Sequence, residues 1–427
     1  MNIPPSSLPI VDEPFPPLQR WGAEEAAQLS SMVEQSSLFY WKGPQTDLLL
    51  SRFRALYPLR YAFACSSGSA ALHIAVAALR LKPGDEVIVP PITDMGSVIG
   101  ILYQQAVPVF ADLEPDTGNL SAKAVRTALT SRTRAIMAVH LAGNPADLHA
   151  LRAIADEHAI ALIEDCAQAW GARWQGQPVG TVGDFGCFSF NDFKHVSSGD
   201  GGVVGTNRDT YGPGLSRWGD KSYDRVKGGR DPEDLAPNYR ISEPQAAVAA
   251  VQLTKLGQIV ERRCHAGTRL GELLGTIDGL RLPVVRTGDQ HSYWFLLTRL
   301  EAQKFRVSRA ELVAALKNQV VECTAGYLPR PVYRYPVFQN HNFFGGAWPV
   351  RDAGYTAMDY RQVQCPVAEE ILNDCIVFRI NEAMTDRYIE KLAKAVRVVF
   401  GQYRRGGFFF WGLFLRSIKG MFENNCF

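Results

Sequence analysis

Short apolar segments alternate with stretches of helical periodicity between residue 58 and about residue 250. The apolar segments are too short for buried helices and read as strands, whereas the intervening stretches repeat their apolar positions with the period of a helix. Strands that alternate with helices indicate a parallel sheet with crossover helices, an α/β fold. The predicted strands lie at 87–91, 108–112, 135–140, 161–165, 185–190 and 201–207.

The remaining segments suggest how the chain is divided. Residues 1–20 are rich in proline and are expected to be extended. An amphipathic helix is predicted within 21–57, a long loop at 212–237, and a helix from about 243 to 263. We therefore expect an N-terminal arm at 1–20, a large α/β domain at 21–255, a smaller C-terminal domain at 256–399 and a tail at 400–427.

Composition excludes several classes of protein. The chain has 427 residues, of which 46% are hydrophobic and 21% charged, enough for a large core and more than one domain. A formal net charge of +2 gives no reason to expect nucleic-acid binding. The cysteines are scattered without a CxxC pair, so neither a metal site nor a disulfide framework is expected. The N-terminal residues have no apolar core of a secretory signal, and we expect a cytoplasmic protein.

The tail contains a cluster of aromatic residues at 408–415. This stretch is far shorter than the roughly 20 apolar residues that a membrane span needs. Wound as a helix, residues 408–422 would place most of their apolar side chains on one broad face. Such a helix can lie on a membrane surface, and it can equally dock on the protein itself or on a partner.

Lys194 stands alone between the apolar strand at 185–190 and a run of serine and glycine. It has no basic neighbours that would form a patch. A single amine at a strand end, beside flexible backbone, suits a Schiff base with pyridoxal phosphate (PLP). Taken alone, this stretch favours a solvated lysine in a surface loop, and other segments of the chain change that balance.

Asp165 ends the apolar run that is predicted as the strand at 161–165. Ligands of open α/β sheets bind at the carboxyl ends of the strands. A carboxylate there can pair with the pyridine nitrogen of PLP and keep it protonated. Capping of the following helix is an equally natural role.

Two further segments carry candidate binding residues. Gly68 and Ser69 open a helix predicted at 70–79, where free backbone N–H groups and the helix dipole favour a phosphate. Asn238 lies in a loop that enters the helix predicted from 243. Taken singly, these segments are also a common turn and a plain helix N-terminus.

Together and in this order, the segments resemble the DegT/StrS-type PLP-dependent aminotransferases, which act on keto sugars and keto cyclitols. The resemblance covers residues 15–398 and extends to the segments 84–91, 108–120, 139–148, 176–190 and 365–371. It implies the PLP-dependent transferase fold type I, with a mostly parallel central sheet flanked by helices and a smaller α+β C-terminal domain. It also implies PLP as the cofactor.

The resemblance assigns roles to individual residues. Lys194 matches the lysine that forms the Schiff base, Asp165 the acid at the pyridine nitrogen, and Gln168 the glutamine beside the ring oxygen. The positions that hold the phosphate are matched by Gly68, Ser69 and Ser189.

The resemblance also implies an assembly. Asn238 matches an asparagine that reaches the phosphate bound by the other subunit, which implies an obligate homodimer with shared active sites. The loop 39–44 lies near the active site in relatives, which makes Trp41 a candidate for substrate contact.

The chain departs from the family pattern at two places. Asp94 stands where relatives carry an aromatic residue that stacks on the pyridine ring. A carboxylate cannot stack and is costly beside a phosphate. Either Asp94 faces away while Met95 or Ile92 covers the ring, or it has a proton-transfer role of its own. The His-Tyr pair of the substrate loop is Gly326-Tyr327 here, and Tyr327 is a second candidate for substrate contact.

The reaction predicted from the resemblance is transfer of an amino group from glutamate or glutamine to a nucleotide-linked keto sugar or a keto cyclitol. The reaction would belong to the biosynthesis of an amino sugar, a cell-surface polysaccharide or a natural product. A related branch of dehydratases has histidine in place of the lysine, so Lys194 favours transamination. A non-catalytic regulatory protein is the other alternative, and the presence of Lys194, Asp165 and Gln168 argues against it.

Overall fold

The computed structural model of the protein describes residues 9–406. The part of the N-terminal arm that it describes, 9–20, contains neither helix nor strand. The arm lies along the C-terminal part of the molecule, where the Asn381 side chain donates to the Pro16 carbonyl over 2.7 Å. The amphipathic segment 408–422 lies outside the described residues, so its predicted membrane or docking role stays a prediction, as does the cytoplasmic location.

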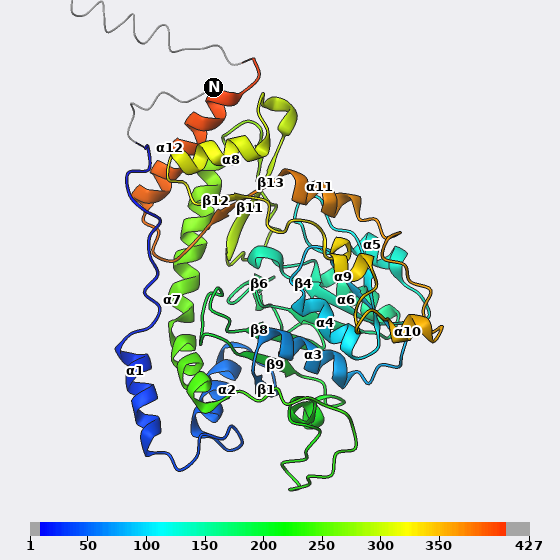
Figure 1. Cartoon of the computed structure of the whole chain (residues 1–427). Helices are drawn as coiled ribbons and strands as arrows, with labels where there is room; N and C mark the ends of the chain where they lie inside the picture. The colour runs from blue at the N-terminus through cyan, green and yellow to red at the C-terminus, as the bar shows by residue number, and fades with distance from the viewer. Residues whose placement is uncertain (1–8, 407–427) are drawn as a thin grey trace, which may run out of the picture.

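A seven-stranded sheet forms the centre of the molecule, in the order β1-β9-β8-β5-β4-β2-β3 (Figure 1). The five neighbouring strands β8, β5, β4, β2 and β3 are parallel, whereas β9 runs antiparallel to both β8 and β1. The mostly parallel sheet and all the predicted strands are therefore confirmed. The strand bounds are β1 (Tyr61–Cys65), β2 (Glu86–Val89), β3 (Val107–Phe110), β4 (Thr133–Val139), β5 (Ala161–Asp165), β8 (Phe185–Ser189) and β9 (Gly202–Thr206).

The strand β1 was not predicted. Two of its residues are alanine, which is a weak strand former, and it runs almost directly into the first helix of the sheet. It forms because it pairs with β9, from Tyr61 opposite Thr206 to Cys65 opposite Gly202. The pairing partner is distant in the chain, so the local pattern did not indicate it.

Helices cover the sheet, and α3 is the most deeply buried of those that position the site. It contacts α4, β8 and β9. The helix begins at Gly68, two residues earlier than expected, because the Ser67 side chain accepts a hydrogen bond from the Ala70 amide over 3.0 Å. The helices of this part are α1 (Ala23–Ser30), α2 (Pro44–Leu56), α3 (Gly68–Ala78), α4 (Gly96–Tyr103), α5 (Ala122–Ala128) and α6 (Leu148–Glu157).

The amphipathic helix predicted within 21–57 is two helices, α1 and α2, separated by the loop that contains residues 39–43. Within the loop 212–237, the first part forms a 3-10 helix, η3 (Gly212–Gly219). The other short elements are η1 (Ser31–Glu34), η2 (Leu141–Gly143), η4 (Ala302–Lys304), η5 (Val332–Arg334), α9 (Pro336–Gln339), α10 (Pro349–Asp352) and the hairpin of β6 (Arg173–Trp174) with β7 (Gln177–Pro178).

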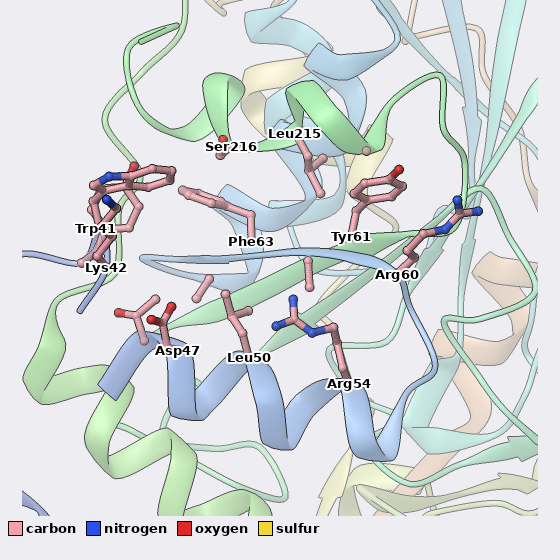
Figure 2. Close-up of a pocket in the computed structure, with 15 residues that line it drawn as sticks. Trp41, Lys42, Asp47, Leu50, Arg54, Arg60, Tyr61, Phe63, Leu215 and Ser216 are labelled. Carbon is pink, nitrogen blue, oxygen red and sulfur yellow. The ribbon is translucent and has the colours of Figure 1, made fainter. Parts of the chain in front are cut away.

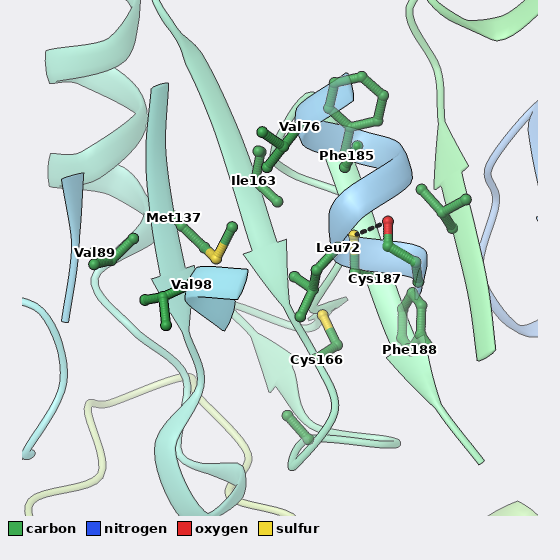
Figure 3. Packing of buried hydrophobic residues seen from close by; sticks show 14 of the residues in the cluster. Leu72, Val76, Val89, Val98, Met137, Ile163, Cys166, Phe185, Cys187 and Phe188 are labelled. Atoms are coloured by element: carbon green, nitrogen blue, oxygen red, sulfur yellow. Dashed lines mark hydrogen bonds between the residues drawn. The ribbon is translucent and has the colours of Figure 1, made fainter. Parts of the chain in front are cut away.

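The core lies between α3 and the centre of the sheet. Leu72 and Val76 of α3 face Ile163 of β5 and Phe185 of β8, and all four side chains are buried (Figure 3). The thiol of Cys187 donates to the backbone carbonyl of Ala71 over 3.5 Å. Burial of this apolar surface fixes the N-terminus of α3 against the end of β8.

A second sheet, antiparallel, builds the C-terminal part in the order β10-β11-β13-β12. The long helix α7 (Glu243–Leu274) packs against α1, α2 and α12, so it runs from one sheet to the other (Figure 1). The boundary expected between residues 255 and 256 falls inside α7, and the domain limits stay predictions. The other elements are β10 (Leu280–Arg281), β11 (Phe295–Leu300), β12 (Cys323–Ala325), β13 (Cys375–Arg379), α8 (Arg309–Asn318), α11 (Pro366–Asp374) and α12 (Asp386–Tyr403).

Within residues 9–406, no helix combines the length and the apolar character that crossing a membrane requires.

Candidate active site

Asp165 is the last residue of β5, and its carboxylate is buried. One carboxylate oxygen accepts a hydrogen bond from the Ser97 hydroxyl (2.8 Å) and the other from the Ala167 amide (3.0 Å). Ser97 is itself held by the Thr93 hydroxyl at 2.6 Å. Burial raises the pKa of Asp165, while its hydrogen bonds and the charge of Lys194 oppose that rise. The bond to Ala167 shapes the turn after β5, and both bonds together fix the orientation of the carboxylate at the strand end. The role of Ser97 was not predicted from the sequence.

Lys194 lies in the turn that follows β8, where its amide donates to the Asn191 carbonyl over 2.9 Å. Its ammonium nitrogen lies 4.0 Å from the centroid of the Trp294 ring. Burial lowers the pKa of the Lys194 amine, whereas the negative charges of Asp165 and Asp94 raise it. A lowered pKa increases the fraction of neutral amine, which is the nucleophilic form that a Schiff base needs.

The N-terminus of α3 meets the end of β8 without a gap. A Cβ atom on Gly68 would lie 2.6 Å from Cβ and 3.0 Å from Oγ of Ser189, so only glycine fits there. Ser69 lies beside α4, because a Cβ on Gly96 would come within 2.4 Å of the Ser69 hydroxyl oxygen. Gly68, Ser69 and Ser189 are therefore together at the positive end of the α3 dipole, a setting that suits a phosphate.

Gly68→Ala is expected to destabilise the protein by about 1–3 kcal/mol and to weaken PLP binding, because the new methyl group pushes β8 away from α3. Thermal unfolding and titration with PLP measure the two effects. Gly257→Ala is the matched control, since a Cβ there meets nothing within 4 Å. That variant should gain about 0.4–1 kcal/mol of stability. Unchanged PLP affinity in Gly68→Ala would contradict the assignment of the phosphate turn.

Gln168 and Tyr327 contact each other although they are distant in the chain. The Gln168 amide nitrogen donates to the Tyr327 hydroxyl over 3.1 Å, and its carbonyl oxygen accepts from the Ala142 amide over 2.8 Å. Tyr327 packs on Phe295 with ring centroids 4.9 Å apart. Burial raises the pKa of the Tyr327 hydroxyl, which therefore stays protonated at neutral pH.

Asp94 has an exposed side chain just before α4. Its carboxylate accepts a hydrogen bond from the Gly96 amide over 2.8 Å, as a residue that shapes a turn does. Its negative charge nevertheless raises the pKa values of Lys194 and Tyr327. Asp94 therefore stands at the edge of the same site, while Ile92 is buried and Met95 is partly buried.

Asp94→Phe is expected to retain activity and to tighten PLP binding, because its ring can stack on the cofactor. The lost turn hydrogen bond should cost about 1 kcal/mol of stability. PLP titration and turnover rates test both effects. Asp94→Asn is the control that keeps a side-chain oxygen for Gly96 and removes the charge. If both variants lost activity while still binding PLP, the Asp94 carboxylate would take part in proton transfer.

Trp41 lines a cavity of about 410 Å³ between α2, β1 and η3 (Figure 2). Arg54, Tyr61 and Leu215 also line it, as do the neighbouring Lys42 and Asp47. The lining includes none of the other residues predicted for the site. Trp41 and Tyr327, the two candidates for substrate contact, thus lie in different surroundings within the described chain.

Asn238 is exposed and lies on a segment that continues toward the phosphate turn. Its side-chain oxygen accepts from the Arg240 guanidinium over 2.7 Å, and the neighbouring Tyr239 carbonyl accepts from the Ser66 amide over 2.7 Å. Asp220, which pairs with Asn238 across an isolated bridge, is buried and bound by the Tyr40 hydroxyl. This network holds the segment that carries Asn238 in place.

His140, Glu164 and Cys166 form a buried cluster whose spacing would suit a metal ion, which the scattered cysteines and histidines of the sequence did not indicate. The cluster has another explanation. The Glu164 carboxylate accepts from His140 Nε2 at 3.0 Å and from the backbone amides of residues 180, 182 and 183. His140 Nδ1 accepts from the Ala146 amide at 3.0 Å. These bonds anchor the loop before β8.

The profile of the DegT/DnrJ/EryC1/StrS aminotransferase family matches residues 20–397. The chain belongs to this family. It is 36% identical over 299 residues to the GDP-perosamine synthase of Vibrio cholerae, which covers 69% of this chain and 80% of that protein. The aminotransferase of Psychrobacter cryohalolentis superposes with a TM-score of 0.82 at 27% identity, covering 91% of this chain and 100% of the other. The S. venezuelae DesV structure gives a TM-score of 0.77 at 29% identity and covers 88% of this chain and 94% of the other.

Membership of the family confirms the resemblance, the fold type and the cofactor. The protein is a PLP-dependent aminotransferase, so the hypothesis of a non-catalytic regulatory protein is wrong. The residues present fit PLP. Asp165 would offer a buried carboxylate to the pyridine nitrogen and Lys194 an amine to the aldehyde, while Gly68 lets the N-terminus of α3 approach Ser189, where the phosphate would bind. When bound, PLP supplies an electron sink for the electrons of the broken bond.

Proposed function

We propose that the enzyme transfers an amino group from glutamate or glutamine to a nucleotide-linked keto sugar in the biosynthesis of an amino sugar. The observation that carries this proposal is the 36% identity to a GDP-perosamine synthase, whose name denotes a GDP-linked amino sugar. Keto cyclitols are the second class of acceptor for the same chemistry.

The proposed roles follow from the position of each side chain. Lys194 holds PLP through its amine and moves the proton on the reacting carbon, because its amine is largely withdrawn from water and lies within the influence of Asp165 and Asp94. Asp165 keeps the pyridine nitrogen protonated from its buried position at the end of β5. Gly68, Ser69 and Ser189 bind the phosphate, and Gln168 orients the ring.

The substrate is proposed to approach from the side of Tyr327, which is bonded to Gln168. Trp41 is the weaker candidate, because it lines the separate cavity beside α2. The lysine at position 194 favours transamination over dehydration, since it can release the aminated product and bind the cofactor again.

The test is an assay of the purified enzyme with PLP, a panel of nucleotide-linked keto sugars, and glutamate, glutamine or alanine as the donor. We expect mass spectrometry to detect an aminated sugar, together with the keto acid of one donor. Lys194→Ala serves as the inactive control. Loss of water from the sugar without amination would instead support the dehydratase alternative, and amination of keto cyclitols alone would reassign the acceptor.

We propose further that the active enzyme is a homodimer with shared sites. Asn238 is exposed in the single chain, and the resemblance to the family implies that this asparagine reaches the phosphate bound by the other subunit. Lys194→Ala and Asn238→Asp are each expected to be nearly inactive. Mixed and refolded in equal amounts, they should recover about a quarter of wild-type activity, because random pairing leaves that share of sites intact. No recovery, with a monomer mass in solution, would contradict shared sites.

A further inference from the structure

One segment, residues 291–294, holds the turn that carries Lys194 from both sides. The Trp294 indole N–H donates to the Phe193 carbonyl over 2.7 Å. On the other side of Lys194, the buried His195 donates through Nε2 to the Ser292 carbonyl over 3.0 Å. The residues immediately before and after Lys194 are thus bonded to the same four-residue segment.

The 291–294 segment is itself hydrogen-bonded to residues 142–143, which bind the Gln168 side chain. The Ser292 amide donates to the Gly143 carbonyl over 3.0 Å, and the Trp294 amide to the Ala142 carbonyl over 2.8 Å. The Ala142 amide in turn donates to the Gln168 side chain. The 291–294 segment is therefore hydrogen-bonded to the Lys194 turn on one side and to residues 142–143 on the other. Through these bonds it fixes the position of the Lys194 turn relative to Gln168.

The Trp294 ring contacts the Lys194 amine as well. The amine nitrogen lies 4.0 Å from the ring centroid, within the range of a cation–π contact. The ring is only partly buried and packs on Phe295 and Tyr327, with centroid distances of 5.0 Å and 6.0 Å. It therefore covers one side of the amine.

We propose that Trp294 is a positioning residue for Lys194, which fixes the lysine turn through its indole N–H and shields the amine with its ring. The proposal rests on the proposed role of Lys194 as the residue that binds PLP. It identifies a further side chain, one outside the sequence motifs, on which the reactivity of the lysine depends.

The charges around Lys194 determine what loss of the ring should do. Asp165 from β5 and Asp94 from the loop before α4 favour the ammonium, whereas burial favours the neutral amine and has the largest influence. Burial keeps the pKa of His195 well below its usual value, so His195 adds no charge at neutral pH. Removing the ring admits water and raises the Lys194 pKa, although the lost cation–π contact acts in the opposite direction.

The experiment uses the protein without PLP and measures the Lys194 pKa by competitive acetylation over a pH series, read out by peptide mass spectrometry. Exposed Lys123 in the same samples is the internal standard. Trp294→Leu is expected to raise the Lys194 pKa. Each unit of that rise lowers the fraction of neutral Lys194 amine at neutral pH by about tenfold. Trp294→Phe keeps a ring and should leave the pKa close to that of the wild type.

Hydrogen exchange of the 190–196 peptide tests the second half of the proposal. It should accelerate in both Trp294 variants, because both lose the bond to the Phe193 carbonyl. Trp218→Leu is the matched control, because the Trp218 ring lies outside the site. Its centroid is 5.8 Å from the central carbon of the Arg80 guanidinium. An unchanged Lys194 pKa in folded Trp294→Leu would overturn the shielding role. Should that variant not fold, unchanged exchange in Trp294→Phe would overturn the anchoring role.

These measurements need no cofactor, so they are independent of the proposed function. If PLP were bound to another lysine, reductive labelling would reveal it while the acetylation result for Lys194 stood.

Discussion

Lys194→Ala is expected to lose transamination by about 10⁴-fold and to lose the covalent attachment of PLP. The amine is the group that can both bind the cofactor aldehyde and carry the proton on the reacting carbon, and general acid–base catalysis alone contributes up to about 10⁴-fold. Alanine leaves neither function. The fold should survive, because the turn around residue 194 is held by the hydrogen bonds of the Phe193 carbonyl and of the His195 side chain.

Borohydride reduction of the PLP-loaded enzyme, followed by peptide mapping, measures the attachment directly. The pyridoxyl label should lie on Lys194 in the wild type and be absent from the alanine variant. Lys123→Ala, on the exposed face of α5, is the control and should keep both label and activity. A label on any other lysine in the wild type would disprove the assignment.

Asp165→Asn is expected to lose about 10²- to 10⁴-fold of activity, because a neutral amide does not hold the pyridine nitrogen protonated. The substitution keeps the shape of the side chain, and the oxygen that remains can still accept from the Ala167 amide. Activity assays should therefore show a loss of turnover in a protein that is folded and binds PLP. Asp116→Asn, at an exposed position, is the matched control.

Stability without PLP provides an independent test of Asp165. Burial raises the pKa of this carboxyl above its unfolded value, so the ionised form opposes folding at neutral pH. Asp165→Asn should therefore be at least as stable as the wild type at neutral pH. The difference should vanish as the pH falls below the ordinary aspartate pKa of about 4. A wild-type rate of transamination in this variant would show that Asp165 is only a turn residue.

Much of the candidate site could be predicted because its residues lie at the ends of predicted elements. Lys194 follows β8, Asp165 ends β5 and Gly68 begins α3, and hydrophobic patterning places each of those ends within a few residues. The carboxyl ends of neighbouring parallel strands meet at one edge of the sheet, so the order of elements also indicates that Asp165 and Lys194 are close.

The side chains that orient these groups could not be predicted in the same way. Ser97 bonds to a carboxylate 68 positions away, and Trp294 to a carbonyl 101 positions away. Nothing in the local pattern around either residue differs from that of an ordinary helix start or strand start. Asp94 shows the same limit, because the sequence left two orientations open, whereas the structure places its carboxylate on the Gly96 amide at the edge of the site.

The sequence by itself determined the class of fold, most strands of the central sheet and the candidates for the reactive groups, because these depend on short-range periodicity and on residue chemistry. Only the tertiary structure decided that β1 pairs antiparallel with β9, that α7 continues to Leu274, and that Trp41 faces a cavity apart from Tyr327. Those features depend on contacts between segments that are distant in the chain. Such contacts are stabilised by packing and pairing that exist only once the elements have assembled.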